Sequence, residues 1–260
     1  MSGTPVDYDQ LAATYDRRFA QGAPRGVAIA LRALARQLDA RRILEVGCGT
    51  GYWLAGLAGP PPRSLCGLDL STGMLAQARS REPSLCLVQG RASHLPFPPA
   101  SFDLVYCVNA IHHFERPAAF IAEARRLIRP GGVLAVVGSD PRQPGDRWYV
   151  YDYFPGTYKT DLNRFPSWGT MLDWMVAAGF EPIQWKLVEK VVSDKVGRAV
   201  LADPFLAKGA VSQLALLSDE AYAAGLDRIE AALAGAEAMG KMLAFPVTFA
   251  LAMLAGRVPP

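Results

Sequence analysis

Three segments of the 260-residue sequence carry residues whose type and spacing could do chemistry. They are the glycines Gly47, Gly49 and Gly51 after one apolar run, Asp69 at the end of the next, and the pair His112–His113 after a later one. Glycines allow a ligand to approach backbone N–H groups closely. A carboxylate accepts hydrogen bonds from hydroxyl groups, and an imidazole can take up a proton near neutral pH. The combination indicates a ligand site with candidate proton acceptors.

Alternating strands and helices must position these segments. Strands are predicted at 42–46, 64–70, 84–90, 102–109 and 133–138, and helices at 28–38, 52–59, 71–79 and 117–128. Pro60, Pro61 and Pro62 should stop the second helix, Ser71 should cap the third, and the "RPGG" at 129–132 should end the fourth. Because the strands are apolar on both faces, this alternation indicates a parallel sheet with helices on both sides.

The pattern changes after the fifth strand. Residues 142–174 are rich in aromatic side chains and are interrupted by prolines and glycines. A helix is expected at 167–178, an extended run at 180–192, helical segments at 196–242 and a last strand at 245–256. We expect one domain, 1–260, which divides into N-terminal helices (1–40), a cofactor-binding core (41–139), an aromatic insertion (140–166), a helix and strand (167–195), a helical insertion (196–242) and a last strand (243–260).

Composition limits the functional classes. With 51% apolar residues the chain can form a packed core, and its net charge of +3 comes from scattered arginines, which is weak support for nucleic-acid binding. The apolar stretch 242–255 falls about six residues short of a bilayer span, and the N-terminal stretch has acidic residues where a secretion signal needs basic ones. We therefore expect a cytoplasmic protein without a membrane partner. Cys48, Cys66, Cys86 and Cys107 lack metal-ligand spacing, so we expect four core residues and no metal site.

The type of ligand follows from the sheet. Parallel sheets bind ligands at the carboxyl ends of their strands, where the glycines and Asp69 lie. Asp69 comes about twenty residues after the glycines, at the position where a carboxylate meets ribose hydroxyls, so an adenosine-containing ligand is indicated. The glycine spacing is G-x-G-x-G, whereas a dinucleotide site uses G-x-G-x-x-G.

At this point the sequence resembles the class I S-adenosylmethionine-dependent methyltransferases, in their small-molecule branch of methyltransferase type 11 and 25. The resemblance covers residues 8–138 and depends on "YDQLAATYD", "ILEVGCGTG", "GLDLS", "VQGRASHLPFPPASFDLVYCVNAIHHF" and "RLIRPGGVLAVVG", which follow one another at typical intervals. It implies a doubly wound, mostly parallel, seven-stranded Rossmann-like sheet with helical and aromatic cap insertions. The implied cofactor is S-adenosyl-L-methionine.

The resemblance also assigns roles to individual residues. It implies that Glu45 supports the glycine loop and that Gly47, Gly49 and Gly51 pass under the methionine part of the cofactor. Asp69 would bind the ribose, Leu70 and Met74 would contact the adenine, Ala92 would offer its backbone to the adenine edge, Asn109 would lie near the methionyl group and Tyr15 would close over the cofactor. One position departs from the family's "GDA" pattern, because Arg91 can only donate hydrogen bonds and cannot accept one from the adenine amine. We expect its side chain to point to solvent.

The acceptor side is less defined. His112 and His113 are candidates for a general base, although a structural role for this pair stays open. Trp148, Tyr151, Tyr153 and Tyr158 could contact a planar or cationic substrate, or could pack the insertion onto the domain. We expect a methyltransferase that acts on a small molecule, as a monomer or a homodimer. The alternatives are an RNA or protein methyltransferase, a nicotinamide-dependent oxidoreductase and a non-catalytic cofactor-binding protein.

Overall fold

A mixed sheet organises the molecule, and the computed structural model describes residues 6–19, 24–60 and 63–260. In this part of the chain the sheet has eight strands in the order β3-β2-β1-β4-β5-β8-β6, and β7 also pairs with β8. Neighbouring strands from β3 to β5 are parallel, and β8 is antiparallel to β5, β6 and β7. The strands are β1 (Arg42–Val46), β2 (Ser64–Asp69), β3 (Cys86–Gln89), β4 (Phe102–Val108), β5 (Ile128–Gly138), β6 (Arg147–Trp148), β7 (Ile183–Val196) and β8 (Ala244–Arg257). The predicted α/β fold is confirmed, and the extra strand is the two-residue β6.

Helices cover both faces of the sheet. On one face, α2 and α3 bury Val27, Leu31 and Leu54, and on the other, α5 and α8 bury Phe120 and Met171. Both faces of the central strands β1, β4 and β5 are therefore closed to water, as their apolar residues predict. The α-helices are α1 (Tyr8–Leu11), α2 (Arg25–Gln37), α3 (Tyr52–Ala55), α4 (Thr72–Arg81), α5 (Pro117–Leu127), α6 (Tyr149–Tyr153), α7 (Thr157–Arg164), α8 (Trp168–Ala177), α9 (Ser212–Ala215) and α10 (Asp219–Ala238). The 3-10 helices are η1 (Tyr15–Phe19), η2 (Ile111–His113), η3 (Gly197–Ala202) and η4 (Pro204–Leu206).

Helix ends follow the sequence signals at one of the three predicted places. The Ser71 hydroxyl accepts a hydrogen bond from the Met74 N–H at 3.1 Å and so caps α4, as predicted. Helix α3 ends at Ala55, earlier than expected, and Pro61 and Pro62 lie outside the described residues. Helix α5 ends before Pro130 is reached, and β5 already begins at Ile128. The "RPGG" segment therefore lies inside β5, where the register with β4 shifts between Phe102 and Leu104.

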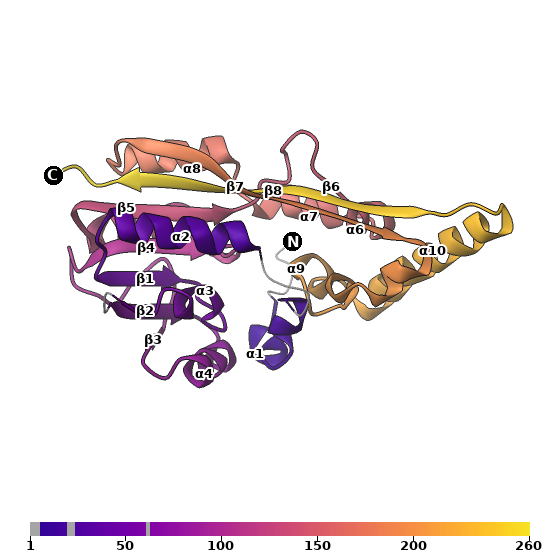
Figure 1. Ribbon diagram of the computed structural model, residues 1–260, viewed down its shortest axis with the longest axis horizontal. Helices are drawn as coiled ribbons and strands as arrows, with labels where there is room; N and C mark the ends of the chain where they lie inside the picture. The colour runs from indigo at the N-terminus through magenta and orange to yellow at the C-terminus, as the bar shows by residue number, and fades with distance from the viewer. Residues whose placement is uncertain (1–5, 20–23, 61–62) are drawn as a thin grey trace.

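Strands β7 and β8 form a long antiparallel ribbon that extends beyond the parallel strands of the sheet. Strands β7 and β8 pair from 183 to 196 and from 244 to 256, so they run past the end of β5 towards α10 (Figure 1). A third hydrophobic cluster, here named the cap cluster, covers this extension and includes Tyr149, Phe154, Ile229, Leu233 and Phe245. The predicted aromatic and helical insertions thus pack together on the extended half of β8.

The cysteine prediction is partly wrong. Cys48, Cys66 and Cys107 are buried, but Cys86 is exposed. The reason is topological, because β3 is an edge strand and, among the described strands, β2 alone pairs with it. Among the described helices, none has both the length and the apolar character needed to cross a membrane.

Candidate active site

A cavity of about 1060 Å³ lies at the carboxyl ends of β1, β2 and β4. Most of the predicted site residues line it: Tyr15, Glu45, Gly47, Gly49, Asp69, Leu70, Met74, Ala92, Asn109, His112 and His113. Gly51 does not line it. Its left-handed backbone instead packs close to α4, where an added Cβ would lie 3.0 Å from the Ala78 Cβ.

The glycine loop is held against the neighbouring strand and leaves one side open. The Gly47 and Cys48 N–H groups donate to the Leu68 carbonyl at 2.7 and 3.1 Å. Gly47 has φ +71°, and an added Cβ would lie 2.6 Å from the Ala110 Cβ. Gly49 has φ +52°, and an added Cβ would meet nothing within 4 Å. Gly47 is therefore needed for packing, whereas Gly49 presents bare backbone to the cavity.

Asp69 ends β2 beside this loop. Its carboxylate accepts hydrogen bonds from the Gly49 N–H at 2.8 Å and the Ser71 N–H at 3.0 Å. Burial raises the pKa of Asp69, although these backbone hydrogen bonds oppose the shift. The next side chain, Leu70, is 57% exposed although it lines the cavity, while Met74 behind it is buried. An acidic group next to an uncovered apolar surface suits a ribose joined to an adenine.

Glu45 and Arg91 also line the cavity. Glu45 is fully buried and accepts a hydrogen bond from the Tyr106 hydroxyl at 3.1 Å, and burial raises its pKa well above the usual range. Arg91 is exposed, as expected, and forms an ion pair with Glu115 at 3.1 Å. An arginine at this position is thus compatible with an open adenine edge.

The N-terminal segment is fastened over the cavity by acidic side chains. Asp9 accepts hydrogen bonds from the Ser71 hydroxyl at 2.7 Å and the Gly73 N–H at 2.6 Å, at the start of α4. Asp16 accepts one from the Thr50 hydroxyl at 2.9 Å and forms an ion pair with Arg81. Sequence reasoning selected only Tyr15 here and missed both aspartates, although they stand in the quoted segment "YDQLAATYD".

The histidine pair lies on η2 at the far side of the glycine loop. The Tyr8 hydroxyl and His113 Nε2 are 2.9 Å apart, and the His112 ring stacks on Phe165 with 3.8 Å between ring centroids. Enclosure by protein, reinforced by Arg164 and Arg18, lowers the pKa of His113 to about 3, and burial lowers that of His112 well below its usual value. Both imidazoles are therefore neutral at pH 7.

The four predicted substrate aromatics do not line this cavity. Trp148 and Tyr153 pack against the cap cluster, and Tyr158 lies edge-on to Tyr151 with 42% of its surface exposed. The Tyr151 hydroxyl donates to Asp161 at 2.8 Å. Trp148 ends β6, Tyr151 and Tyr153 lie on α6, and Tyr158 lies on α7. The sequence periodicity gave no sign that these rings would pack on one another and on the cap cluster instead of lining the cavity.

Helix α7 supplies the cavity lining from this region. Thr160, Asn163 and Arg164 line the cavity together with Leu216, which follows α9. None of these was singled out from the sequence, where "DLNRF" lacks a distinctive pattern.

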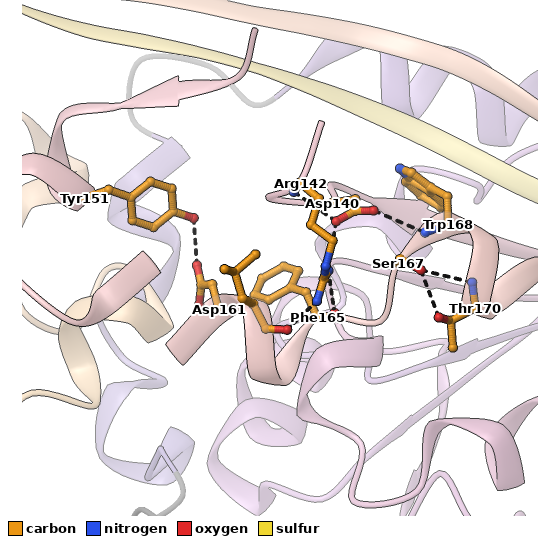
Figure 2. A network of polar contacts seen from close by, with 9 residues as sticks. Asp140, Arg142, Tyr151, Asp161, Phe165, Ser167, Trp168 and Thr170 are labelled. Atoms are coloured by element: carbon orange, nitrogen blue, oxygen red, sulfur yellow. Dashed lines mark hydrogen bonds and ion pairs between the residues drawn. The ribbon is translucent and has the colours of Figure 1, made fainter. Parts of the chain in front are cut away.

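A polar network holds the middle and the C-terminal end of α7 (Figure 2). In the middle, Asp161 accepts a hydrogen bond from the Tyr151 hydroxyl and another from Arg164 at 2.6 Å. Just past the C-terminal end, Arg142 donates to the Phe165 carbonyl at 3.0 Å and to Asp140 at 3.0 Å. The second Asp140 oxygen accepts the Trp168 N–H at 3.2 Å, at the start of α8. The Arg164 side chain thus projects from a rigid support.

Comparison with known proteins agrees with this geometry. Residues 44–136 match the family model described as a methyltransferase domain. Over these residues the chain is similar to that methyltransferase family. The match includes the glycine loop, Asp69, Asn109 and the histidine pair, so the resemblance that the motifs indicate is confirmed for this region.

The domain's relatives include several bacterial methyltransferases. The chain is 40% identical over 116 residues to a phthiotriol/phenolphthiotriol dimycocerosates methyltransferase from Mycobacterium leprae, and the match covers 44% of this chain and 43% of the relative. It is 36% identical over 119 residues to a fatty-acid O-methyltransferase from Mycolicibacterium smegmatis (45% and 43% covered). It is 35% identical over 141 residues to a demethylmenaquinone methyltransferase from Beutenbergia cavernae (52% and 58% covered). The matches span about half the length of these relatives.

Solved structures share the fold over more of the chain. A phosphoethanolamine N-methyltransferase 2 from Haemonchus contortus with bound S-adenosyl-L-methionine has a TM-score of 0.59 at 17% identity, covering 97% of this chain and 57% of that one. A [4+2]-cyclase has a TM-score of 0.58 at 22% identity, with 99% of both chains covered. At these identities the likeness concerns the fold alone. The cyclase illustrates that the fold hosts more than one reaction.

Proposed function

We propose that this chain transfers a methyl group from S-adenosyl-L-methionine to a small-molecule acceptor. The observation that carries the proposal is that a single cavity joins Asp69 and the open side of Gly49 to His113 and Arg164. The methyltransferase domain match over the same residues supports it. A cofactor and an acceptor can therefore meet inside one enclosure.

The residues fit the cofactor part by part. Asp69 would accept hydrogen bonds from the ribose hydroxyls, and Leu70, Met74 and the Ala92 backbone would contact the adenine. Gly49 leaves room for the methionine part, near Asn109, because an added Cβ at Gly49 would enter open space.

The N-terminal segment would complete the cofactor site. Tyr15 would cover the cofactor. Arg18 stacks on the Tyr15 ring at 3.7 Å, and its buried Nε has no hydrogen-bond partner among the described residues, so it is suited to the methionyl carboxylate.

The protein's contribution would be mainly positional. The sulfonium of the cofactor is an activated methyl donor, so the chain has to hold an electron-rich acceptor atom in line with the methyl group and keep water out. Asp9 and Asp16 fasten the N-terminal segment across the cavity, which serves the exclusion of water. The neutral histidines would shape the acceptor side.

The acceptor class is drawn from the relatives, whose names refer to phthiotriol dimycocerosates, fatty acids and demethylmenaquinone. We infer a small molecule rather than RNA or protein, and a cytoplasmic protein that works as a monomer or homodimer. The G-x-G-x-G spacing disfavours a nicotinamide-dependent oxidoreductase.

Calorimetry with S-adenosyl-L-methionine and S-adenosylhomocysteine tests the proposal. We expect both to bind at micromolar concentration, and NADH to leave the protein unaffected. Methyl transfer is then tested with radiolabelled cofactor and a panel of small carboxylates, phenols and amines. Failure of both sulfur compounds to bind would refute the proposal, whereas tight binding without any labelled product would favour a cofactor-binding or non-transferring role.

A further inference from the structure

The wall of the cavity beyond the histidine pair is formed by α7. A second cavity of about 500 Å³ adjoins it there. The two cavities share His112, Phe114, Glu115, Asn163 and Arg164 as lining residues. Arg164 thus stands at the junction between the proposed methyl donor and a further space that could hold the body of an acceptor.

Arg164 has donor capacity that the protein leaves unused. Its Nη2 donates to Asp161 at 2.6 Å and to the Ser212 hydroxyl at 3.1 Å. Its Nε is buried and has no hydrogen-bond partner in the described part of the chain. A buried donor without a partner costs free energy, and a bound ligand with an acceptor atom would remove that cost.

The charges around this wall favour an anion. Arg18 approaches from the N-terminal segment; burial is the largest cause of the low pKa of His113, and the positive charges of Arg164 and Arg18 add to it. Asp161 is the ion-pair partner of Arg164 at 2.6 Å, and Glu115 forms an ion pair with Arg91. The guanidinium groups attract a negative group to this wall.

We propose that this end of the cavity binds a carboxylate acceptor and that Arg164 is the residue that selects it. The inference rests on the proposed methyl transfer and specifies its acceptor. A carboxylate is planar and matches the fork of a guanidinium better than a hydroxyl or an amine does. An amine acceptor would meet the guanidinium of Arg164 at this wall.

The chemistry balances without a base. A carboxylate oxygen attacks the methyl carbon, an O–C bond forms, the S–C bond breaks and its electron pair goes to sulfur. The products are a neutral methyl ester and S-adenosylhomocysteine, and no proton is transferred. This agrees with histidines that have a low pKa, because His113 at about 3 is a weak base at pH 7.

The reaction also predicts which kinetic constant Arg164 controls. The negative charge on the acceptor disappears as the ester forms, so the ion pair with Arg164 is strongest before the reaction. Removing it should therefore raise KM for the acid more than it lowers kcat. A purely structural residue would not separate the two constants in this way.

The test compares matched acceptors on the full chain in the presence of S-adenosylhomocysteine. Octanoate and benzoate are titrated against octanol, octylamine, benzyl alcohol and benzylamine. We expect the acids to bind and the alcohols and amines to bind at least ten times more weakly. Arg164→Gln should weaken binding of the acids about 10- to 100-fold and leave the affinity for S-adenosylhomocysteine unchanged. With labelled S-adenosyl-L-methionine, the bound acid should yield the methyl ester.

Two further variants are needed, because Arg164→Gln also removes the ion pair with the buried Asp161. Asn163→Asp places a negative charge on the same wall at an exposed helix position and should also weaken binding of the acids. Arg198→Gln removes a positive charge from an exposed surface pair with Glu230 and should change nothing. If Arg164→Gln does not fold, Asn163→Asp decides the question.

The outcomes separate this inference from the proposed function. Normal binding of S-adenosylhomocysteine together with no binding of either acid, or equal binding of acid and alcohol, overturns the carboxylate proposal alone. Unchanged binding of the acids by Asn163→Asp and Arg164→Gln also overturns it. Failure of S-adenosylhomocysteine itself to bind overturns the proposed function.

Discussion

Two glycines of the same loop, Gly47 and Gly49, should respond differently to the same substitution. Gly47→Ala forces a Cβ to 2.6 Å from the Ala110 Cβ at φ +71°. The left-handed backbone costs about 1–2 kcal/mol, and overpacking adds about 1–3 kcal/mol, so the free energy of unfolding should fall by about 2–5 kcal/mol. Gly49→Ala has φ +52° but open space around the Cβ, so it should cost only the backbone strain, about 1–2 kcal/mol.

Cofactor binding should separate the two variants further. The methyl group of Gly49→Ala would protrude into the cavity that we assign to the methionine part of the cofactor, and a misfit there should weaken binding about 10- to 100-fold. Denaturant unfolding measures the first effect, and calorimetry with S-adenosylhomocysteine measures the second. Wild-type affinity in Gly49→Ala, with the protein folded, would refute the placement of the cofactor on this loop.

Three further predictions follow from single contacts. Asp69→Asn should weaken S-adenosylhomocysteine binding at least about tenfold, because a charged acceptor of ribose hydrogen bonds is lost, while the exposed control Asp152→Asn keeps wild-type affinity in the same calorimetric titration. Tyr151→Phe removes one donor from Asp161 and should lower the free energy of unfolding by about 1–2 kcal/mol without changing cofactor affinity, and an affinity change would contradict the assigned supporting role. His113 has a pKa of about 3 in the folded protein. Below pH 6.5 this histidine is therefore protonated in the unfolded chain but stays neutral in the folded protein, so the free energy of unfolding falls as the pH falls. The full pKa shift corresponds to a loss of about 2 kcal/mol in the free energy of unfolding between pH 7 and 5, and solvent in the open cavity should reduce this loss to about 1 kcal/mol. Denaturant unfolding of wild type and His113→Gln at both pH values measures the difference.

Local sequence patterns predicted the structure where it depends on residues that are close together in the chain. The parallel half of the sheet follows from the apolar runs and the helices between them, and Ser71 caps α4 as its position suggests. The glycine loop and Asp69 meet because the carboxyl ends of parallel strands lie at one edge of a sheet. The signals were weaker at helix ends: α5 ends before Pro130, because the strand hydrogen bonds to β4 already begin at Ile128.

The acceptor side was decided only by the tertiary structure. The direction of the rings at 148–158 depends on how α6 packs against β8, a strand almost a hundred residues further along the chain. For the same reason Tyr151 supports α7 instead of lining the cavity, and Arg164 reaches the cavity without any motif around it. The sequence by itself was enough to predict that the glycine loop, Asp69 and Asn109 lie at one edge of the sheet, because each stands at or directly after the end of a strand. The opposite wall depends on packing between distant segments, because no local pattern predicts which face of a short helix will contact a distant strand.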